Sequence, residues 1–490
     1  MINTRTLSGQ REGTSGSGLA LLVIATAQLM LVLDDSIANI ALPSIQRELD
    51  IPAATLSWII NAYILAFGGL LLFGGRLGDV LGRRRVLQVG MAIFTLASFL
   101  AGLANSGHGL IGWRALQGVG AAMTAPNVLA LIATTFPEGK RRDGAMAVYG
   151  AMSGLGLVAG LLLGGTLTAL VGWRWVFFIN VPIGLLVLLG SRSLNEAQLH
   201  EGALDVAGAV TSVFGMTALI FGITHGGEHG WLDAMTLAAF ALALSLLVAF
   251  VLLQKRGKDP LLPLRLLNSR QRSGAYGAAL LLGFGPMGTL YLMTLYMQEV
   301  LRYDALKTGL AWLPFGLGIV AGAIITSKVV SKLSPRVLAV WGAITASGSM
   351  FWLSMLGQSV HYASHVMPAM FGVAFGFVMA ILSVTLMAVQ SVRAQDSGIA
   401  SALLNASQQI GVALGLAILS TISVSVTNER MPNALENLRQ GWQAPDMDAV
   451  RAAGDALVHG YSVALVFGAI AVALAALVAL FSNQASRGAR

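Results

Sequence analysis

Long apolar segments recur along almost the whole chain, and they restrict its possible fold more than any other feature. Runs of roughly 18 to 25 mostly apolar residues are long enough to cross a hydrocarbon core of about 30 Å. Because backbone groups cannot stay unpaired in lipid, such segments form either helices or a closed barrel. Barrel strands alternate in polarity over about ten residues, whereas continuous runs such as 236–253 do not alternate. The sequence therefore predicts an all-α integral membrane protein.

Composition leads to the same class. Only 11% of the 490 residues are charged and 56% are hydrophobic, whereas a soluble protein carries about 25% charged residues. The chain has no cysteine, which excludes disulfides and thiolate metal sites. The first apolar run lacks a small-residue cleavage site and is too long for the core of a signal peptide, so we expect it to be the first membrane helix.

The apolar runs predict fourteen transmembrane spans. With the N-terminus in the cytoplasm, 22 of the 30 Lys and Arg residues fall in cytoplasmic segments and seven in outer loops, while Arg114 lies inside a span. This bias predicts that both termini are cytoplasmic and that the number of spans is even. The predicted spans lie near 19–42, 55–73, 86–104, 109–132, 144–170, 174–190, 205–223, 232–253, 274–298, 308–327, 337–357, 365–389, 398–424 and 460–481.

Two polar segments divide the chain. Residues 191–204 are acidic and residues 254–273 form a basic linker with two prolines, and together they bracket spans 7 and 8. The basic linker either anchors the topology or binds anionic lipid headgroups. We therefore expect an N-terminal six-helix bundle at 1–195, an inserted transmembrane hairpin at 196–260, and a C-terminal six-helix bundle at 261–490 with a long outer segment at 425–459.

Two adjacent carboxylates, Asp34 and Asp35, interrupt the apolar stretch "LMLVLDDSIANIALP". A carboxylate deep in a bundle faces protein or a water-filled cavity, because exposure to lipid costs several kcal/mol, and such acids are usually functional. Neighbours on a helix point about 100° apart, so we expect the two acids to have different roles. Arg114 stays charged when buried and needs a partner. The alternative is structural: hydrogen-bonded acids, with Asp35 paired to Asn39, and Arg114 in a fixed ion pair.

A tight turn, "GRLGDVLGRRRVL" at 75–87, follows the second span. Glycine allows close backbone approach or positive φ, and an aspartate there can cap the next helix or pair with an arginine. These residues alone predict no more than a well-anchored hairpin. The residues that mark the loop are Gly75, Gly78, Asp79, Gly82, Arg83 and Arg84.

The loop resembles the signature between helices 2 and 3 of the major facilitator superfamily, G-x-L-x-D-x-x-G-R-R-x-x-L. Further segments resemble, in the same order, the motifs of its fourteen-helix drug:proton antiporter subfamily, and together they cover nearly the full chain. These segments are "LDDSIANIALP" (33–43), "WRALQGVGAA" (113–122), "GWRWVFFINVPIG" (172–184), "LAWLPFGLG" (310–318) and "GIASALLNASQQIGVALG" (398–415).

The resemblance implies a major facilitator fold of 6 + 2 + 6 helices, with pseudo-twofold halves that rock around a midplane site. It also implies proton-coupling roles. Asp34, which aligns with the acid of the family motif, would be the coupling acid or an anchor for a cationic substrate, and Asp35 an accessory acid. Arg114 would relay protons or orient helices 1 and 4. Asp79 would belong to a cytoplasmic gating loop that fastens to the other half in the outward-facing state.

The chain departs from the family pattern at two positions. Val80 stands where the signature loop usually has a basic residue, and Leu161 replaces the proline of the helix 5 motif G-P-x-x-G-G. Losing that proline removes a possible kink, so the resemblance gives no antiport role to position 161. The glycines remain and predict close packing of two helices; they are Gly156, Gly160, Gly164 and Gly165.

A transport pocket is expected between the halves at mid-depth, where Met and aromatic side chains offer adaptable apolar surface. Ordinary bundle packing is the alternative for each candidate. The apolar candidates are Met123, Met152, Phe284, Met287, Tyr291, Trp312, Phe375 and Met379. The polar candidates in the thirteenth span are Asn405, Gln408 and Gln409, with hydrogen bonding between helices as their alternative role.

The sequence offers no sign of an enzyme or a cofactor. The spaced histidine pairs lack an organised carboxylate or thiolate, so we expect no metal site. The phosphate-binding pattern G-x-x-x-x-G-K-[ST] is absent, so the proton motive force, not ATP, is the expected energy source.

We therefore expect a proton-coupled exporter of hydrophobic, cationic or amphipathic drugs in the cytoplasmic membrane. One elementary charge crossing 100 mV is worth about 2.3 kcal/mol. The expected partners are a small-molecule substrate, protons and membrane lipids, without nucleic acid, and we expect a monomer. The alternatives are a dedicated exporter of one metabolite, such as an endogenous antibiotic, a siderophore or an organic anion, and, more remotely, a non-transporting sensor or membrane enzyme.

Overall fold

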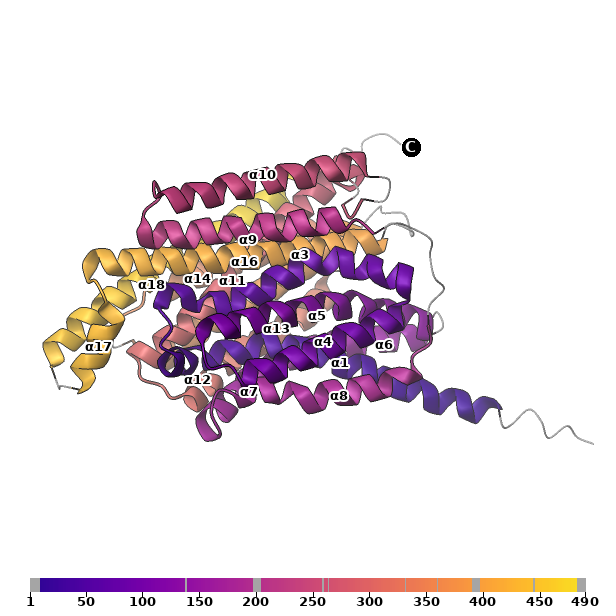
Figure 1. Ribbon diagram of the computed structural model, residues 1–490, viewed down its shortest axis with the longest axis horizontal. Coiled ribbons are helices and arrows are strands. Elements are labelled where there is room, and N and C mark those ends of the chain that lie inside the picture. Colours follow the sequence, from indigo (N-terminus) through magenta and orange to yellow (C-terminus); the bar gives the residue numbers. More distant parts are fainter. Residues whose placement is uncertain are drawn as a thin grey trace, which may run out of the picture.

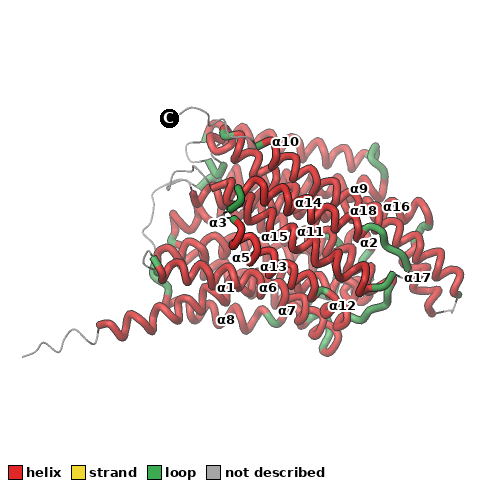
Figure 2. Tube along the Cα trace, turned by 180° about the vertical axis from the view of Figure 1, so that it is seen from behind, coloured by secondary structure: helices red, strands yellow, loops and turns green. Residues whose placement is uncertain are grey.

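The fold is a bundle of long helices that run side by side along one common direction (Figure 1). The computed structural model describes residues 9–136, 139–196, 204–257, 260–262, 264–330, 332–358, 360–389, 397–443 and 446–482. Over these residues it contains helices and loops but no β-strand (Figure 2). We call the end at which α1 begins the termini end and the opposite end the α17 end (Figure 1).

The first bundle is built from the N-terminal helices. In it α1 packs against α6 and α8, and α5 packs against α3 and α4. Its elements are α1 (Gly9–Leu49), α2 (Ala53–Leu56), α3 (Trp58–Leu81), α4 (Arg83–Gly102), α5 (Gly107–Thr135), α6 (Lys140–Leu170), α7 (Trp175–Phe178), α8 (Asn180–Gly190) and the short 3-10 helix η1 (Ser191–Ser193).

The second bundle follows a hairpin and a 3-10 turn, which are α9 (Val206–His229), α10 (Ala234–Arg256) and η2 (Leu264–Asn268). In this bundle α11 packs against α16 and α18, and α15 packs against α13 and α14. Its elements are α11 (Arg270–Leu295), the π-helix η3 (Tyr296–Val300), α12 (Ala305–Ala311), α13 (Leu313–Val329), α14 (Pro335–Leu353), the π-helix η4 (Tyr362–Val366), α15 (Met367–Val389), α16 (Ser397–Arg430), α17 (Ala434–Gln443) and α18 (Met447–Phe481).

Local residues explain where several helices begin. Gly82 has φ +102° and separates α3 from α4, a conformation that glycine adopts readily. The Ser106 side chain accepts from the backbone N–H of Gly109 and caps α5, and Asp233 caps α10 in the same way. Such caps satisfy backbone donors that the first helical turn leaves unpaired.

The hairpin of α9 and α10 lies along one side of the molecule, with α9 in contact with both α3 and α16 (Figure 1). These two helices belong to different bundles, so the hairpin covers a junction between them. Its outer surface is apolar: Phe214 is 60% exposed and Leu244 66%. A large exposed apolar surface of this kind suits contact with lipid rather than water.

The predicted fold class is confirmed. Thirteen of the described helical segments are long and apolar enough to cross a membrane. The remaining predicted span, 337–357, is occupied by α14, which packs against α15 and α18 and is made less apolar by its Ser, Thr, Gly and Trp residues. The prediction that residues 1–195, 196–260 and 261–490 form separate units stays a prediction, and residues 197–203 lie outside the described part.

Three helices extend beyond their predicted spans at the α17 end. α1 continues to Leu49, α16 to Arg430, and α18 begins at Met447 instead of residue 460. Hydropathy marks only the part of a helix that lies in hydrocarbon, whereas these extensions carry polar side chains. The predicted outer segment 425–459 is therefore largely helical and contains α17.

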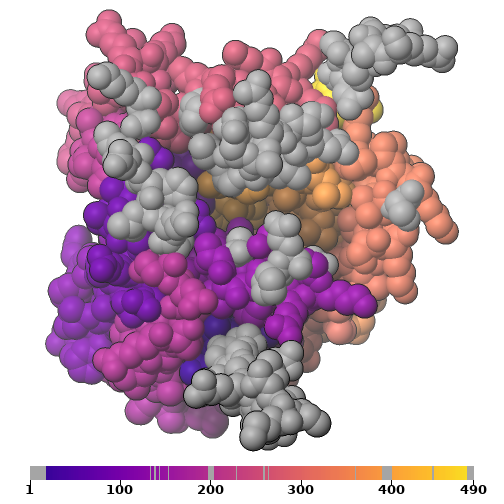
Figure 3. All heavy atoms as spheres, turned by 90° about the vertical axis from the view of Figure 1, so that its right-hand side faces the viewer, coloured from indigo at the N-terminus to yellow at the C-terminus, as the bar shows by residue number. Residues whose placement is uncertain are grey.

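The two bundles meet along a surface that we call the seam. It is formed by α1, α3 and α6 of the first bundle and by α11, α12, α13 and α16 of the second. At the α17 end the bundles are hydrogen-bonded, for example from Gln298 Nε2 to the Ile40 carbonyl at 2.9 Å. At the termini end, Figure 3 shows that the surface recedes between the purple first bundle and the orange second bundle.

The packing of α1 on α6 gives a stability prediction. A Cβ added at Gly160 would overlap Ser36 Oγ and lie 2.8 Å from the Leu33 carbonyl oxygen. Gly160→Val should therefore lower the melting temperature of the detergent-solubilised protein by several degrees, because overpacking costs about 1–3 kcal/mol. The matched control is Gly154→Val on the same helix, where a Cβ would meet nothing within 4 Å. Equal melting temperatures for the two variants would contradict this packing.

Candidate functional site

A buried ion pair joins Asp34 of α1 to Arg114 of α5 inside the first bundle. Arg114 Nη1 lies 2.6 Å from Asp34 Oδ2, and both side chains are 0% exposed. The structure thus identifies Asp34 as the partner that a buried arginine needs. Removing either member of such a pair leaves an uncompensated charge in a medium of low dielectric.

Further donors complete the coordination of the Asp34 carboxylate. Gln117 Nε2 and Asn180 Nδ2 donate to Asp34 Oδ1 at 3.1 and 2.7 Å. Both amides also donate to Ser98 Oγ at 3.0 Å, and Ser98 in turn donates to the Phe177 carbonyl at 3.0 Å. We call Asp34, Ser98, Arg114, Gln117 and Asn180 the charge cluster.

Arg114 extends the charge cluster to a further helix. Its Nε donates to the Ile59 carbonyl of α3 at 3.0 Å, and its guanidinium carbon lies 4.4 Å from the centre of the Tyr63 ring. A cation over an aromatic face is stabilised by the ring quadrupole. The cluster therefore holds α1, α3, α4, α5 and α8 together through a single buried charge pair.

Asp35 lies on a different face of α1. Its Oδ1 is buried and has no hydrogen-bond partner among the described residues, and the residue as a whole is half-buried. Asn39 Nδ2 donates to the Asp35 backbone carbonyl at 3.0 Å, not to the carboxylate, and lies 4.0 Å from Met287 Sδ on α11. Because residues four apart share a helix face, Asp35 lies on the side of α1 that meets the second bundle.

Glycines bring α6 close to α1 on a third face. Gly156, Gly160 and Gly164 lie against Val32, Ser36 and Ile37. Small residues of this kind let membrane helices approach closely. Three consecutive residues of α1, Asp34, Asp35 and Ser36, thus face the charge cluster, the seam and α6.

The last residues of the helix 5 motif lie on the seam. A Cβ at Gly165 would lie 2.5 Å from the Ala305 carbonyl oxygen, and one at Gly309 would lie 2.7 Å from the Leu161 carbonyl oxygen. Across Leu161, α6 continues as a single helix to Leu170, as expected where the family proline is missing.

The loop at 75–87 is bonded within the first bundle. Arg83 donates to Asp79 Oδ1 from Nη2 at 2.9 Å and to the Ala130 carbonyl at 3.4 Å. The Arg84 backbone N–H donates to Glu196 Oε1 at 3.0 Å. That Asp79 fastens to the other half in another state stays a prediction.

The glycines of this loop allow close packing on α5. A Cβ at Gly78 would overlap the Asn127 side chain, and one at Gly75 would lie 3.5 Å from Pro126. Asn127 also donates to the Gly74 carbonyl at 3.0 Å. The glycine positions therefore set how closely α3 and α5 approach near the termini end.

Some apolar pocket candidates lie at the seam and others do not. Met287 contacts Asn39 across the seam, and Tyr291 lines the cavity described below. Met123 instead packs on Gly90 of α4 within the first bundle. Trp312 is fully buried, with its ring centre 5.3 Å from that of Phe315.

The remaining candidates are scattered. The backbones of Phe284 and Gln408 pack within the second bundle, against Gly415 and Gly283, whereas Gln409 lies against Gly68 across the seam. The ring of Phe375 stacks on that of Phe371 at 6.0 Å. The exposure of the other three differs: Met379 is buried, Met152 half-buried and Asn405 exposed.

A second polar network links the bundles at the α17 end. Glu299 lies in the π-helix η3 with its side chain only 5% exposed, and Arg439 of α17 donates to it from Nη2 at 2.8 Å and from Nε at 3.2 Å. Arg47 of α1 lies 3.5 Å from the same carboxylate, and Arg439 also donates to Gln46 at 3.1 Å. We call Gln46, Arg47, Glu299 and Arg439 the clasp. π-helices occur frequently at functional sites.

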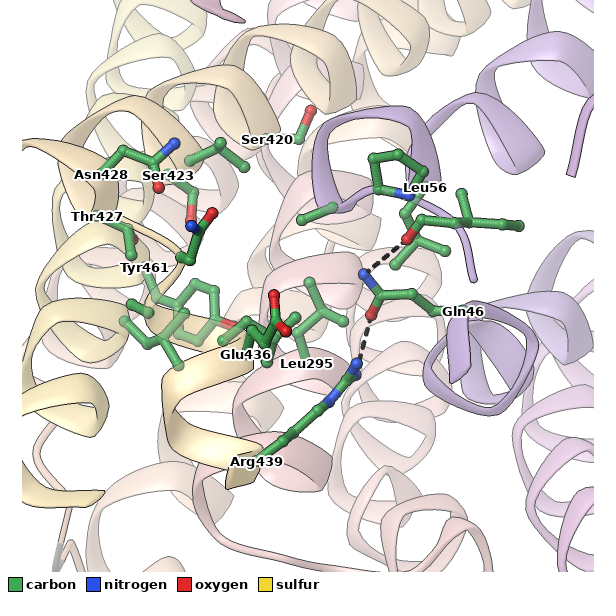
Figure 4. Close-up of a pocket in the computed structure, with 18 of the residues that line it drawn as sticks. Gln46, Leu56, Leu295, Ser420, Ser423, Thr427, Asn428, Glu436, Arg439 and Tyr461 are labelled. Carbon is green, nitrogen blue, oxygen red and sulfur yellow. Dashed lines mark hydrogen bonds between the residues drawn. The ribbon is translucent and has the colours of Figure 1, made fainter. Parts of the chain in front are cut away.

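A cavity of about 850 Å³ lies next to the clasp, between the ends of the two bundles and α17 (Figure 4). Figure 4 shows Gln46 on one side, with Arg439 reaching to it from α17, and Ser420, Ser423, Thr427 and Tyr461 on the other. The volume is in the range of sites for drug-sized ligands, about 300–1,000 Å³.

The described residues do not assemble a metal site: among them, no three His, Asp or Glu side chains come together as ligands. His225 instead lies 3.1 Å from Asp233, and its ring stacks on His229. The backbone N–H groups of Thr236 and Met235 hold the pKa of Asp233 below its usual value.

Sequence reasoning missed several of these residues. Gln117 lies in the motif segment 113–122 and Asn180 in the segment 172–184. A polar side chain within an apolar span could have marked each of them as a functional candidate. Glu299 and Arg439 are 140 residues apart and lie in polar end segments. Charge is ordinary there, so the sequence carried no comparable signal for the clasp.

Comparison with known proteins identifies the family to which this chain belongs. Residues 24–416 match the family model of the Major Facilitator Superfamily. The puromycin resistance protein pur8 of Streptomyces alboniger is 39% identical over 464 residues, covering 94% of this chain and 90% of that protein. The cephamycin export protein CmcT of Amycolatopsis lactamdurans is 38% identical over 429 residues, covering 86% and 88%.

A solved structure has the same fold. It is the crystal structure of a bacterial homolog of the human lysosomal transporter Spinster in an inward-facing, unoccupied conformation, with a TM-score of 0.69 and 16% identity over 96% of this chain and 99% of that one. The chain therefore belongs to the Major Facilitator Superfamily, whose members are multi-pass membrane transporters of small molecules and not enzymes.

Proposed function

We propose that this protein exports hydrophobic, cationic or amphipathic small molecules across the cytoplasmic membrane in exchange for protons. Export is supported by the relatives described above, one named for antibiotic resistance and one for antibiotic export. The observation that carries the exchange mechanism is the Asp35 carboxyl, which lies at the seam with an unpartnered oxygen. A buried carboxylate on such a path can bind a proton or a cation in turn.

Asp35 suits proton exchange better than Asp34, although Asp34 aligns with the family motif. Protonating Asp34 would break its ion pair and leave the fully buried Arg114 charge uncompensated. Protonating Asp35 would break no hydrogen bond of Oδ1. We therefore assign exchange to Asp35 and assign Asp34 and Arg114 to a fixed cluster that holds α1 in place.

The orientation follows from charge. The excess of Lys and Arg in the segments at the termini end supports an orientation with that end in the cytoplasm. The recess in Figure 3 then opens to the cytoplasm, and the clasp closes the outer end through its contacts with α1. In the opposite state the clasp opens, and Asp79 with its loop fastens the cytoplasmic end. The chain works as a monomer in contact with lipid.

Export is then coupled to proton entry because the substrate and the proton compete for one site. A cationic substrate from the cytoplasm binds at Asp35 near Met287, the halves rock, and an external proton displaces it. Because proton and cation share one carboxylate, each excludes the other, and the proton gradient drives export.

A dedicated exporter of one metabolite is the second candidate. It is favoured by the fact that each of the two relatives is named for a single antibiotic. Uptake of chemically unrelated cations into inverted vesicles supports the multidrug reading. Uptake of one compound alone from the same panel would contradict that reading and support the dedicated exporter.

Replacing each acid tests the assignment. In inverted vesicles, the proton-driven uptake of ethidium, a fluorescent cation, should be at least about tenfold slower for Asp35→Asn than for the parent. The melting temperature of this variant should stay close to that of the parent. Asp34→Asn should instead lower the melting temperature markedly, because breaking a buried charge pair costs about 3–5 kcal/mol. Both variants preserve side-chain volume.

The reverse pattern would contradict the assignment. If Asp34→Asn is stable but inactive while Asp35→Asn transports normally, the coupling acid is Asp34, as the family motif implies. If the parent itself takes up no ethidium under an imposed proton gradient, the multidrug proposal is wrong.

Breaking the clasp should open the outer end. Glu299→Gln leaves Arg439 and Arg47 without their carboxylate. A cysteine at position 39, introduced as Asn39→Cys into the cysteine-free chain, should then react faster with a membrane-impermeant maleimide added outside cells. We expect an increase of roughly threefold, because the lost contact between the bundles joins Glu299 to the half-exposed Arg47 and exposed ion pairs contribute about 0.2–1 kcal/mol.

The control for this experiment is Asp448→Asn. Asp448 lies at the same end with a 97% exposed side chain, and among the described residues its one ion pair is with Arg451 at 4.0 Å. The same rise in labelling from this variant, or no rise from Glu299→Gln, would show that the clasp does not hold the outer end closed.

A further inference from the structure

One wall of the cavity at the α17 end is lined by polar side chains of α16. One face of α16 contributes Ser420, Ser423 and Thr427, which recur every three or four residues and so form one stripe, and Asn428 lies next to it. Hydroxyl and amide side chains can both donate and accept hydrogen bonds. This wall therefore suits a ligand that carries several hydroxyl, amide or carbonyl groups.

The floor of the cavity is aromatic and apolar. Tyr291 of α11 and Tyr461 of α18 line it together with Leu295 and Leu457. The two tyrosine residues are only 3% and 4% exposed. Tyrosine offers a flat apolar surface with one polar group, which suits an amphipathic ring system.

Charge at the cavity is negative. Asp50 and Glu436 both line it, and neither forms an ion pair with a described residue. Arg439 also lines the cavity, and Glu299 is shared between it, at 2.8 Å, and Arg47, at 3.5 Å. The three carboxylates of Asp50, Glu299 and Glu436 therefore outnumber the two arginines. Figure 4 shows the Glu436 carboxylate among the residues around the cavity. A positive group on a ligand would therefore be attracted to this lining.

The cavity is separate from the Asp35 region. Asp35, Asn39 and Met287 do not line it, whereas Tyr291, one helical turn beyond Met287, does. Tyr291 thus lies at the boundary between the two regions along α11. A molecule that leaves the Asp35 region toward the outer end would therefore reach this cavity before it is released.

We infer that this cavity is a second binding site on the exit side, for amine-bearing amphipathic molecules rich in hydrogen-bonding groups. The inference rests on the proposed export function and extends it to the substrate class. The amine interacts with Asp50 and Glu436, the polar groups with the α16 stripe, and the rings with Tyr291 and Tyr461. Helix α17 forms one wall, so the site exists only while the outer segment is folded against the bundles.

Cysteine protection tests the site. Asn428→Cys places the single cysteine of the full-length chain in the cavity lining at an exposed position. The probe is doxorubicin, which combines an amine, hydroxyls and fused rings. At saturation it should slow labelling by neutral N-ethylmaleimide at least about fivefold, since a bound ligand of this size fills much of the cavity. The control, Asp448→Cys, replaces a 97% exposed side chain at the same end that does not line the cavity and should show no protection.

Two comparisons test the chemistry of recognition. N-acetyl-doxorubicin, which lacks the positive charge, should protect Asn428→Cys only at higher concentration. Adding Asp50→Asn and Glu436→Gln should raise the doxorubicin concentration for half-protection roughly fivefold. Equal protection by both compounds would overturn the charge assignment.

Failure of this inference is distinct from failure of the proposed function. If vesicles containing the parent accumulate doxorubicin but the drug does not protect Asn428→Cys, the exit-side site is wrong and export stands. If the drug protects Asn428→Cys and the parent moves neither doxorubicin nor ethidium, the site stands and the export proposal is wrong.

Discussion

The buried pair of Asp34 and Arg114 is the interaction on which the first bundle depends. Two opposite charges with 0% exposure lie 2.6 Å apart in a protein whose surroundings are hydrocarbon. Neither can be left alone at that depth, so the helices that carry them must stay together. Gln117 and Asn180 complete the shell around the carboxylate, which ties α5 and α8 to the same point on α1.

Fixing α1 in this way decides what its other faces can do. With Asp34 turned into the bundle, the geometry of a helix turns Asp35 to the seam and Ser36 to the glycines of α6. The charge that stabilises the fold and the carboxyl proposed for exchange are therefore adjacent residues with separate tasks. Farther along, Glu299 and Arg439 of the second bundle contact Arg47 and Gln46 of α1 and so link the bundles at the α17 end, beside a cavity that a departing molecule would cross.

The fold could be predicted from sequence largely because lipid leaves few alternatives. The long apolar runs located the helices, and α14 was found at its predicted place although it is not among the thirteen segments that are apolar enough to span a membrane. Asp34, Asp35 and Arg114 stood out as charges inside apolar runs. The cluster partners Ser98, Gln117 and Asn180 are also polar within apolar spans, but only the folded chain shows that these three meet at Asp34. The clasp was missed because its charges lie in polar end segments. Met123, a pocket candidate, lies against Gly90 within the first bundle, and periodicity does not show which neighbour a helix face meets.

The most direct test of this account counts protons. Tetraphenylphosphonium, a permanent cation, is added to the weakly buffered, detergent-solubilised protein, and the pH change is compared with the amount bound. If a proton and a cation compete for Asp35, the parent should release about one proton per bound cation at a pH where the carboxyl is protonated, and Asp35→Asn should release none. Release from Asp35→Asn equal to that of the parent would contradict the central claim and transfer the exchange to another carboxyl.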